Sequence, residues 1–132
     1  MDELNLSEFT IIDKIETLDK IIFYVIPKYY PYSCPICGGA LTKHAKTERR
    51  ARDINILNKN VMIIIKAFRF RCLECNNVFT QQFNSIHYRD KVTIRLITYI
   101  KLKALEIQKK QNAELSKELN LSTATIKNIR KL

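Results

Sequence analysis

The sequence predicts an α+β fold in which short β-strands come first and helices come last. Up to residue 87, β-prone residues stand in short runs separated by turn residues. Two pairs of cysteines bracket the middle of the chain, and from residue 88 the apolar residues recur with a helical period. A chain of 132 residues has room for one modest domain or for two small modules.

Residues 1–33 are expected to form a small β-hairpin. Runs 9–16 and 21–27 are rich in Ile, Phe and Val, and turn-forming residues at 17–20 separate them. In the second run both alternating sets of side chains are apolar, so we expect this strand to be covered on both faces. The hairpin would then pack on the segment that follows it.

Residues 34–87 hold all four cysteines, arranged as Cys34-Pro35-Ile36-Cys37 and Cys72-Leu73-Glu74-Cys75. A C-x2-C pair places two thiolates on one tight turn, and two pairs complete the tetrahedral shell of one zinc ion. Glycines follow the first pair and asparagines the second, and both residue types tolerate the left-handed backbone. We therefore predict a zinc ribbon with one structural Zn2+, and the alternatives are disulfides or a redox pair.

Two longer β-prone runs, 52–57 and 61–71, lie between the cysteine pairs. The second run ends in alternating phenylalanine and arginine, so its rings face one side and its guanidinium groups the other. The rings are expected in the ribbon core. The arginines of this region either contact phosphate groups or form a solvated sheet face; they are Arg49, Arg50, Arg52, Arg69 and Arg71.

Residues 88–132 are expected to be helical. Asp90 is a candidate N-cap for an apolar stripe that runs from Val92 to Ala104. Between residues 114 and 130, apolar residues at helical spacing surround Asn120 and Ser122, which suit a turn and a helix cap. This pattern predicts a helix-turn-helix, and the alternative is an ordinary helical hairpin.

The second helix of such a motif would enter the major groove of DNA. An asparagine on its outer side suits an adenine, and small or methyl-bearing side chains suit a thymine methyl group. The outward positions, which are the candidate DNA contacts, are Thr123, Ala124, Lys127, Asn128 and Lys131.

The charge of the chain favours a polyanionic partner. The net charge is +10, the pI is about 9.6, and the positive excess lies after residue 33. The start of the chain, Met1-Asp2-Glu3, is acidic where a secretory signal would be basic, and the apolar runs are too short to span a membrane. We expect a cytoplasmic protein without a membrane partner.

The order of these motifs resembles the N-terminal region of bacterial insertion-sequence transposases of the ISL-three family. The resemblance rests on the hairpin, Cys-Pro-x-Cys-Gly, the basic stretch 50–53, the run from Phe68 through Cys75, and the final helices. It implies a protein that binds double-stranded DNA at transposon ends or inverted repeats, in the bacterial nucleoid. Each cysteine matches a zinc ligand of the family: Cys34, Cys37, Cys72 and Cys75.

Transposases of this family continue into a catalytic domain with three metal-binding carboxylates. The present sequence ends at Leu132, so we expect DNA binding without catalysis, in a truncated transposase or a stand-alone relative. Two alternatives stay open at this point. The ribbon would serve as a protein–protein interaction module, or the chain would be the regulatory DNA-binding subunit of a separate catalytic transposase chain. A homodimer is likewise left open.

Overall fold

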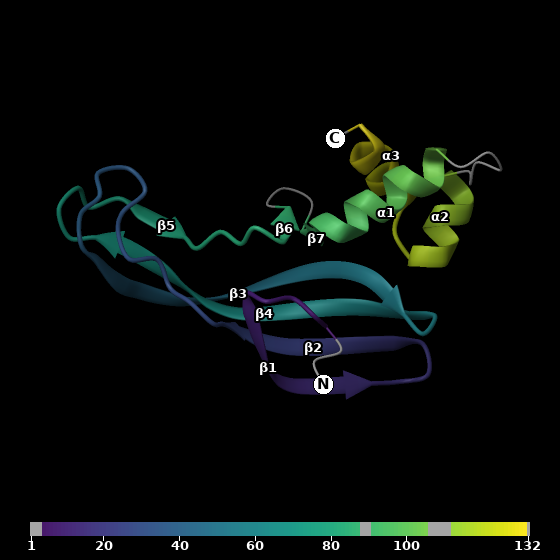
Figure 1. Ribbon diagram of the computed structural model, residues 1–132, viewed down its shortest axis with the longest axis horizontal. Helices are drawn as coiled ribbons and strands as arrows, with labels where there is room; N and C mark the ends of the chain where they lie inside the picture. The colour runs from purple at the N-terminus through teal and green to yellow at the C-terminus, as the bar shows by residue number, and fades with distance from the viewer. Residues whose placement is uncertain (1–3, 88–90, 106–111, 132) are drawn as a thin grey trace.

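The structure is a computed structural model that describes residues 4–87, 91–105 and 112–131. Its two long strands run the length of the molecule, with the cysteine-bearing loops at one end and the helices at the other (Figure 1). The elements in chain order are β1 (Phe9–Glu16), β2 (Lys20–Pro27), β3 (Leu41–Ile56), β4 (Lys59–Cys72), β5 (Val78–Thr80), β6 (Ile86–His87), β7 (Val92–Thr93), α1 (Ile94–Leu105), α2 (Asn112–Leu119) and α3 (Thr123–Arg130).

One seven-stranded sheet connects the N-terminal hairpin to the cysteine-bearing segment. Its order is β1-β2-β4-β3-β7-β6, and β5 adds to β4 outside this path. The hairpin strands are antiparallel, but β2 pairs with β4 in parallel, from Lys20 opposite Asn60 to Val25 opposite Ile65. Strands β3 and β4 are joined at Leu57 and Asn58, whose positive φ values of 50° and 63° suit a two-residue hairpin turn.

The main core lies on one face of this sheet. Alternate residues of β2 and β4, such as Phe23 and Ile63, are fully buried against Leu4, Phe9 and Phe83. The expectation that β2 is covered on both faces is wrong. Its other alternating set is only half-buried, and Ile26 is 36% exposed, because the described segments that close the core pack on a single face.

A second core holds the three helices together. Its fully buried side chains come from all of them: Leu96, Ile100, Leu115, Leu119, Ile126 and Ile129. Thr93 caps α1, since its hydroxyl accepts a hydrogen bond of 3.2 Å from the amide of Leu96. The predicted cap Asp90 lies outside the described residues. Ser122 caps α3 by accepting from the amide of Thr125.

The predicted fold class is wrong. The protein is mostly β-sheet, and the expected helix-turn-helix region after the ribbon is not found. The strands of the expected hairpin and of the expected ribbon belong to one continuous sheet. The described residues 94–105 and 112–131 instead contribute three helices that share one core and are tied to the sheet. The apolar spacing indicates which side chains are buried, but it carries no information about the partner they pack against.

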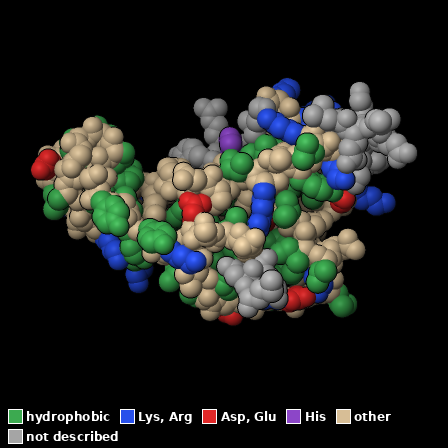
Figure 2. Space-filling model, viewed as in Figure 1, with side chains coloured by type: hydrophobic (Ala, Val, Ile, Leu, Met, Phe, Trp, Pro, Cys, Tyr) green, Lys and Arg blue, Asp and Glu red, His purple; other side chains and the backbone are tan. Residues whose placement is uncertain are grey.

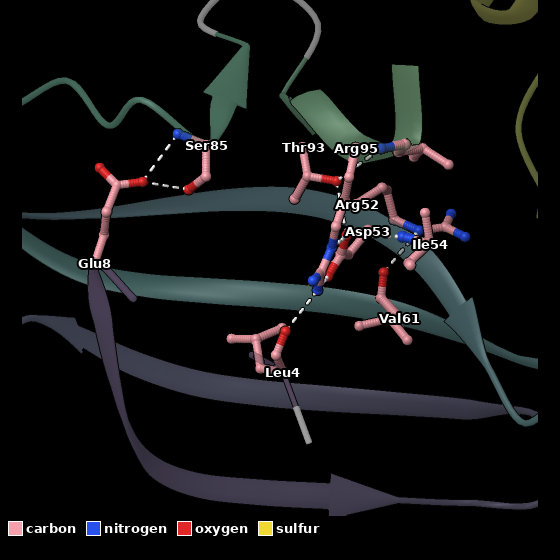
Figure 3. Close-up of polar contacts among 10 residues, drawn as sticks. Leu4, Glu8, Arg52, Asp53, Ile54, Val61, Ser85, Thr93 and Arg95 are labelled. Carbon is pink, nitrogen blue, oxygen red and sulfur yellow. Dashed lines mark hydrogen bonds and ion pairs between the residues drawn. The ribbon is translucent and has the colours of Figure 1, made fainter. Parts of the chain in front are cut away.

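A buried ion pair ties α1 to the sheet (Figure 3). Asp53 of β3 is 1% exposed and receives hydrogen bonds from Thr93 Oγ1 at 2.7 Å and from Arg95 Nε at 2.8 Å. A second guanidinium nitrogen of Arg95 bonds the other carboxylate oxygen and the carbonyl of Leu4, the latter at 2.7 Å. The pair therefore joins strand, helix and N-terminal segment at one point.

Strand β3 also caps the end of α2. The guanidinium of Arg52 donates to the carbonyl oxygens of Leu119 at 2.6 Å and Asn120 at 3.2 Å, and Asn55 donates to that of Glu118 at 3.1 Å. These carbonyls lie at the negative end of the helix dipole, where a cation is stabilising. Asn120 has a φ of 53°, the left-handed conformation that ends the helix.

Candidate zinc centre and basic surfaces

The two cysteine pairs form knuckles of the same shape. In the first, the amide of Gly38 donates to the carbonyl of Cys34 and the amide of Cys34 to that of Gly39, both at 2.9 Å. In the second, Asn76 and Asn77 take the places of the glycines around Cys72, with bonds of 3.1 and 2.9 Å. Gly38 and Asn76 have φ values of 76° and 62°. The left-handed residue after each pair, expected from the sequence, thus closes each knuckle.

The four sulfur atoms converge on one point with the spacing of a zinc site. All Sγ atoms lie within 4.8 Å of one another, with 3.7 Å between Cys34 and Cys75 and 3.3 Å between Cys37 and Cys72. A tetrahedron with Zn–S bonds of about 2.3 Å has edges of about 3.8 Å. The sulfur pairs are too far apart for disulfides, whose bond is about 2.05 Å. The ligand set fits one structural zinc ion that is saturated by four thiolates.

Hydrogen bonds from backbone amides lower the pKa of two of the four thiols, which favours the thiolate form that binds a cation. The Cys75 amide lowers the pKa of the Cys72 thiol to about 6, and the Cys37 amide lowers the pKa of Cys34. The Gly39 amide lowers the pKa of Cys37, but the thiol groups of Cys72 and Cys75 outweigh it and raise the value to about 12. Four thiolates at this spacing repel one another, and a divalent cation at their centre offsets that repulsion.

An aromatic cluster supports the knuckles. Phe70 is buried, and its ring centroid lies 6.0 Å from that of Phe79 and 6.2 Å from that of Tyr30. Phe68 lies 6.0 Å from Tyr30 and 6.5 Å from Phe70. The prediction that the phenylalanines pack together on one side of β4 is confirmed.

The five candidate arginines fall on both faces of the sheet. Arg69 and Arg71 are exposed beside each other on the face opposite the aromatic cluster. Arg49 donates to the carbonyl of Gln81 at 3.0 Å, with its guanidinium carbon 5.9 Å from the centroid of the Phe83 ring. Arg50 is exposed on the face that carries the aromatic cluster. Arg52 instead donates hydrogen bonds to the backbone at the end of α2. The structure brings together only Arg69 and Arg71 as exposed neighbours on one face.

The five candidate contacts near the C-terminus all have exposed side chains. Ile126 and Ile129 turn the opposite side of α3 into the helical core. The outer side of the helix and its first following residue therefore present Thr123, Ala124, Lys127, Asn128 and Lys131. In Figure 2, Lys and Arg side chains appear both over the helical end and over the opposite lobe of the molecule.

Sequence reasoning missed a set of lysines and aromatic rings on the face of the sheet that carries the aromatic cluster. The Nζ of Lys43 lies 4.7 Å from the centroid of the Tyr30 ring and 4.3 Å from that of Phe68, and Lys66 Nζ lies 5.9 Å from that of Tyr24. The strand period of Lys46, Glu48 and Arg50 was a signal for a charged face on β3. It was missed because the expected strand began only at residue 52.

Comparison with known families identifies the cysteine-bearing segment. Residues 31–75 match the family described as the zinc-finger of transposase IS204/IS1001/IS1096/IS1165. The match covers less than half of the chain and contains all four ligands. The resemblance to ISL-three transposases is thereby confirmed for the zinc ribbon. Searches of curated proteins and of solved structures found no match.

The family match includes a zinc ribbon and no catalytic domain. In the part of the chain that the structure describes, the cysteines are the one group of three or more His, Cys, Asp or Glu side chains arranged to hold a metal ion. No described helix combines the length and apolar character needed to cross a bilayer.

Proposed function

We propose that this chain is a DNA-binding, transposase-like protein that recognises a specific double-stranded sequence and does not itself cut or join DNA. The observation that carries the proposal is the transposase-type zinc ribbon at residues 31–75, in a chain with a net charge of +10. DNA that carries transposon ends or inverted repeats is the partner that this ribbon favours.

Two separate surfaces would contact the DNA, one its phosphates and the other its bases. Arg69 and Arg71 are exposed side by side near the zinc centre, where they suit contacts to phosphates that carry no sequence information. The outer side of α3 offers Asn128, an amide that pairs well with adenine, next to Lys127. Arg52 is left out of the contact surface, because its guanidinium is committed to α2.

The described acidic side chains support the absence of cleavage. Asp53 is bound to Arg95, Glu16 to Lys59 at 2.5 Å, and Glu8 to the amides of Asn84 and Ser85 at 2.9 Å. Carboxylates that hold two catalytic divalent ions must instead converge on a common point. The zinc ion has four sulfur ligands and leaves no position for an activated water.

The test is binding to a labelled inverted-repeat duplex across a salt series, with magnesium present in one arm to reveal nicking. Replacing both Arg69 and Arg71 by Ala is expected to weaken binding to all sequences and to reduce the salt slope by about 0.9 per lost contact. Asn128→Ala is expected to alter the preference at one base pair by about 1–3 kcal/mol. Lys59→Ala is the matched control, because Glu16 already neutralises this cation.

Unchanged affinity in both the arginine and the Asn128 variants would replace this proposal with the protein–protein interaction module. Specific nicks at the duplex ends, removed by changing one carboxylate, would disprove the absence of catalysis. A duplex that binds only in the presence of a separate catalytic chain would favour the regulatory-subunit alternative.

A further inference from the structure

The described residues leave one face of the sheet open toward its zinc end, where the face is both apolar and basic; near Met62, at the other end, the end of α2 lies close to it. We call it the open face and define it by alternate residues of three strands: Ile22, Tyr24 and Ile26 of β2, Met62, Ile64, Lys66 and Phe68 of β4, and Lys46, Glu48 and Arg50 of β3. The register places Tyr24, Ile64 and Arg50 in one row across the strands. The next rows place Lys66 beside Glu48, and Phe68 beside Lys46. An apolar stripe, buried at Ile64 and half-buried at most other positions, thus runs along a column of charged side chains.

A hollow with an aromatic wall lies at the zinc end of the open face. Its volume is about 570 Å³, and its lining includes Tyr30, Phe68, Ile26, Lys46 and Lys66. Tyr30 is 38% exposed and meets Phe68 edge-on. The Nζ of Lys43 lies over both rings, 4.7 Å and 4.3 Å from their centroids, so a stacking base must displace this exposed side chain or use the other face of each ring. Apolar and aromatic side chains therefore line the hollow together with two exposed lysines. A hollow of this size and lining is typical of a site for a flat, partly apolar, anionic group.

We infer that the open face binds a single DNA strand, whose bases stack on Tyr30 and Phe68 and whose phosphates contact Lys46 and Lys66. The inference rests on the proposed function only in taking DNA as the partner. Stacking on aromatic side chains combined with a basic track is the general way in which proteins hold unpaired strands.

The charges of the open face complement a phosphate backbone. Successive outward residues of β3 are about 6.8 Å apart, a repeat comparable with that of phosphates along an extended strand. The one carboxylate among them, Glu48, lies 3.6 Å from Arg50 and is offset by it. Lys46, opposite Phe68 on β3, and Lys66, two residues before Phe68 on β4, remain as exposed cations.

The chemistry of the open face separates a single strand from a duplex. The bases of a DNA duplex are stacked on one another, so aromatic side chains on a sheet cannot reach the flat faces of these bases. A single strand offers both ring faces and phosphates. An acidic amphipathic peptide has charge and apolar groups too, but it gains nothing specific from an exposed tyrosine ring over an aliphatic side chain of similar size.

The experiment measures fluorescence anisotropy of a labelled oligothymidine and of a labelled hairpin duplex on the zinc-loaded chain. The double variant Lys46→Glu with Lys66→Glu is expected to weaken binding of the single strand about tenfold or more and to lower its salt slope by about 1.4, for two contacts at about 0.7 each. Duplex binding, which uses other residues, is expected to change far less. Tyr30→Leu keeps an apolar side chain and is expected to weaken the single strand, whereas Tyr30→Phe keeps the ring and the affinity.

Three results would overturn the inference. The first is an equal loss of single-strand and duplex binding in the lysine variant. The second is single-strand binding that is indifferent to Tyr30→Leu. The third is an acidic peptide that competes with the oligothymidine at equal concentration. Failure of the proposed function would give a different result. The unchanged chain would then show no sequence preference among duplexes, while Lys46→Glu with Lys66→Glu would still weaken binding of the single strand.

Discussion

At the scale of single residues, Asp53 connects its own strand, β7 and α1. Its carboxylate is buried and accepts from its own strand at the Ile54 amide, from Thr93 and from Arg95. The side chain of Arg95 is 30% exposed, so water partly supports it. Burial removes the hydration of this carboxylate, and the three donors compensate for that loss.

Replacing Asp53 with Ala is expected to lower the free energy of unfolding by about 3 kcal/mol, because it leaves the Arg95 guanidinium largely buried without its carboxylate. Urea unfolding of the zinc-loaded protein measures the change. Glu48→Ala is the control, since its pair with Arg50 joins side chains that are 48% and 67% exposed, and about 0.5 kcal/mol or less is expected. Equal effects of the two variants would show that the buried pair has no special weight.

The sequence predicts residues of the site whose partners are close in the chain, but it does not predict contacts between residues that are far apart in the chain. Cys34 and Cys37 lie within one turn, so their spacing alone predicts that they bind the same metal ion. Asp53 and Arg95 are 42 positions apart, and no local pattern connects them. The same holds for Arg52, which the sequence offers as a phosphate contact and the fold places against the end of α2.

At the scale of elements, β3 departs most from expectation. It has 16 residues, whereas the sequence indicated only residues 52–57 as a strand. The missing part, from Leu41 to Ala51, is polar on both sides and therefore lacks the apolar alternation that identifies a strand. It is a strand because the strongly apolar β4 pairs with it along its length.

Arg52→Met tests the cap that β3 provides for α2. Burial lowers the pKa of Arg52, and its guanidinium donates to three backbone carbonyls, those of Val61, Leu119 and Asn120. Methionine keeps much of the stem but no donor, so we expect the free energy of unfolding to fall by about 1–2 kcal/mol. Arg50→Met is the matched control on the same strand face and should change it by less than about 0.5 kcal/mol. Similar losses in both would count against the cap.

At the scale of the whole molecule, the metal and the two apolar cores are separate sources of stability. The cysteines belong to neither core cluster. The zinc knuckles lie at one end of the long strands, and the helices lie at the other (Figure 1). Loss of the metal should therefore be a local event.

Cys72→Ser, or a chelator, is expected to remove the metal and to expose the amides of 34–42 and 70–78 to hydrogen exchange. The amides of Ile63, Ile65 and Ile100, within the cores, should stay protected. The sign of the pH dependence follows from the thiolates. The pKa of Cys72 in the metal-free site is lowered to about 6, so this ligand is ionised at neutral pH. Protons compete with the metal for the thiolates, so metal affinity is expected to fall as the pH is lowered, and displacement of bound zinc requires a pH below that value. Global unfolding on chelation would contradict the separation.

The pairing of β3 with β4 sets a distance as well as a stability. Arg69 lies opposite Ala45, seven positions along β3 from Arg52, where the helices attach. At about 3.3 Å per residue this is about 23 Å, roughly two-thirds of the 34 Å repeat of a DNA helix. In the proposed DNA complex the strand pair would therefore fix the spacing of the two contact surfaces. Two residues added to each strand would keep every side chain on its face, yet move the zinc lobe by about 7 Å, or two base pairs, relative to the helices.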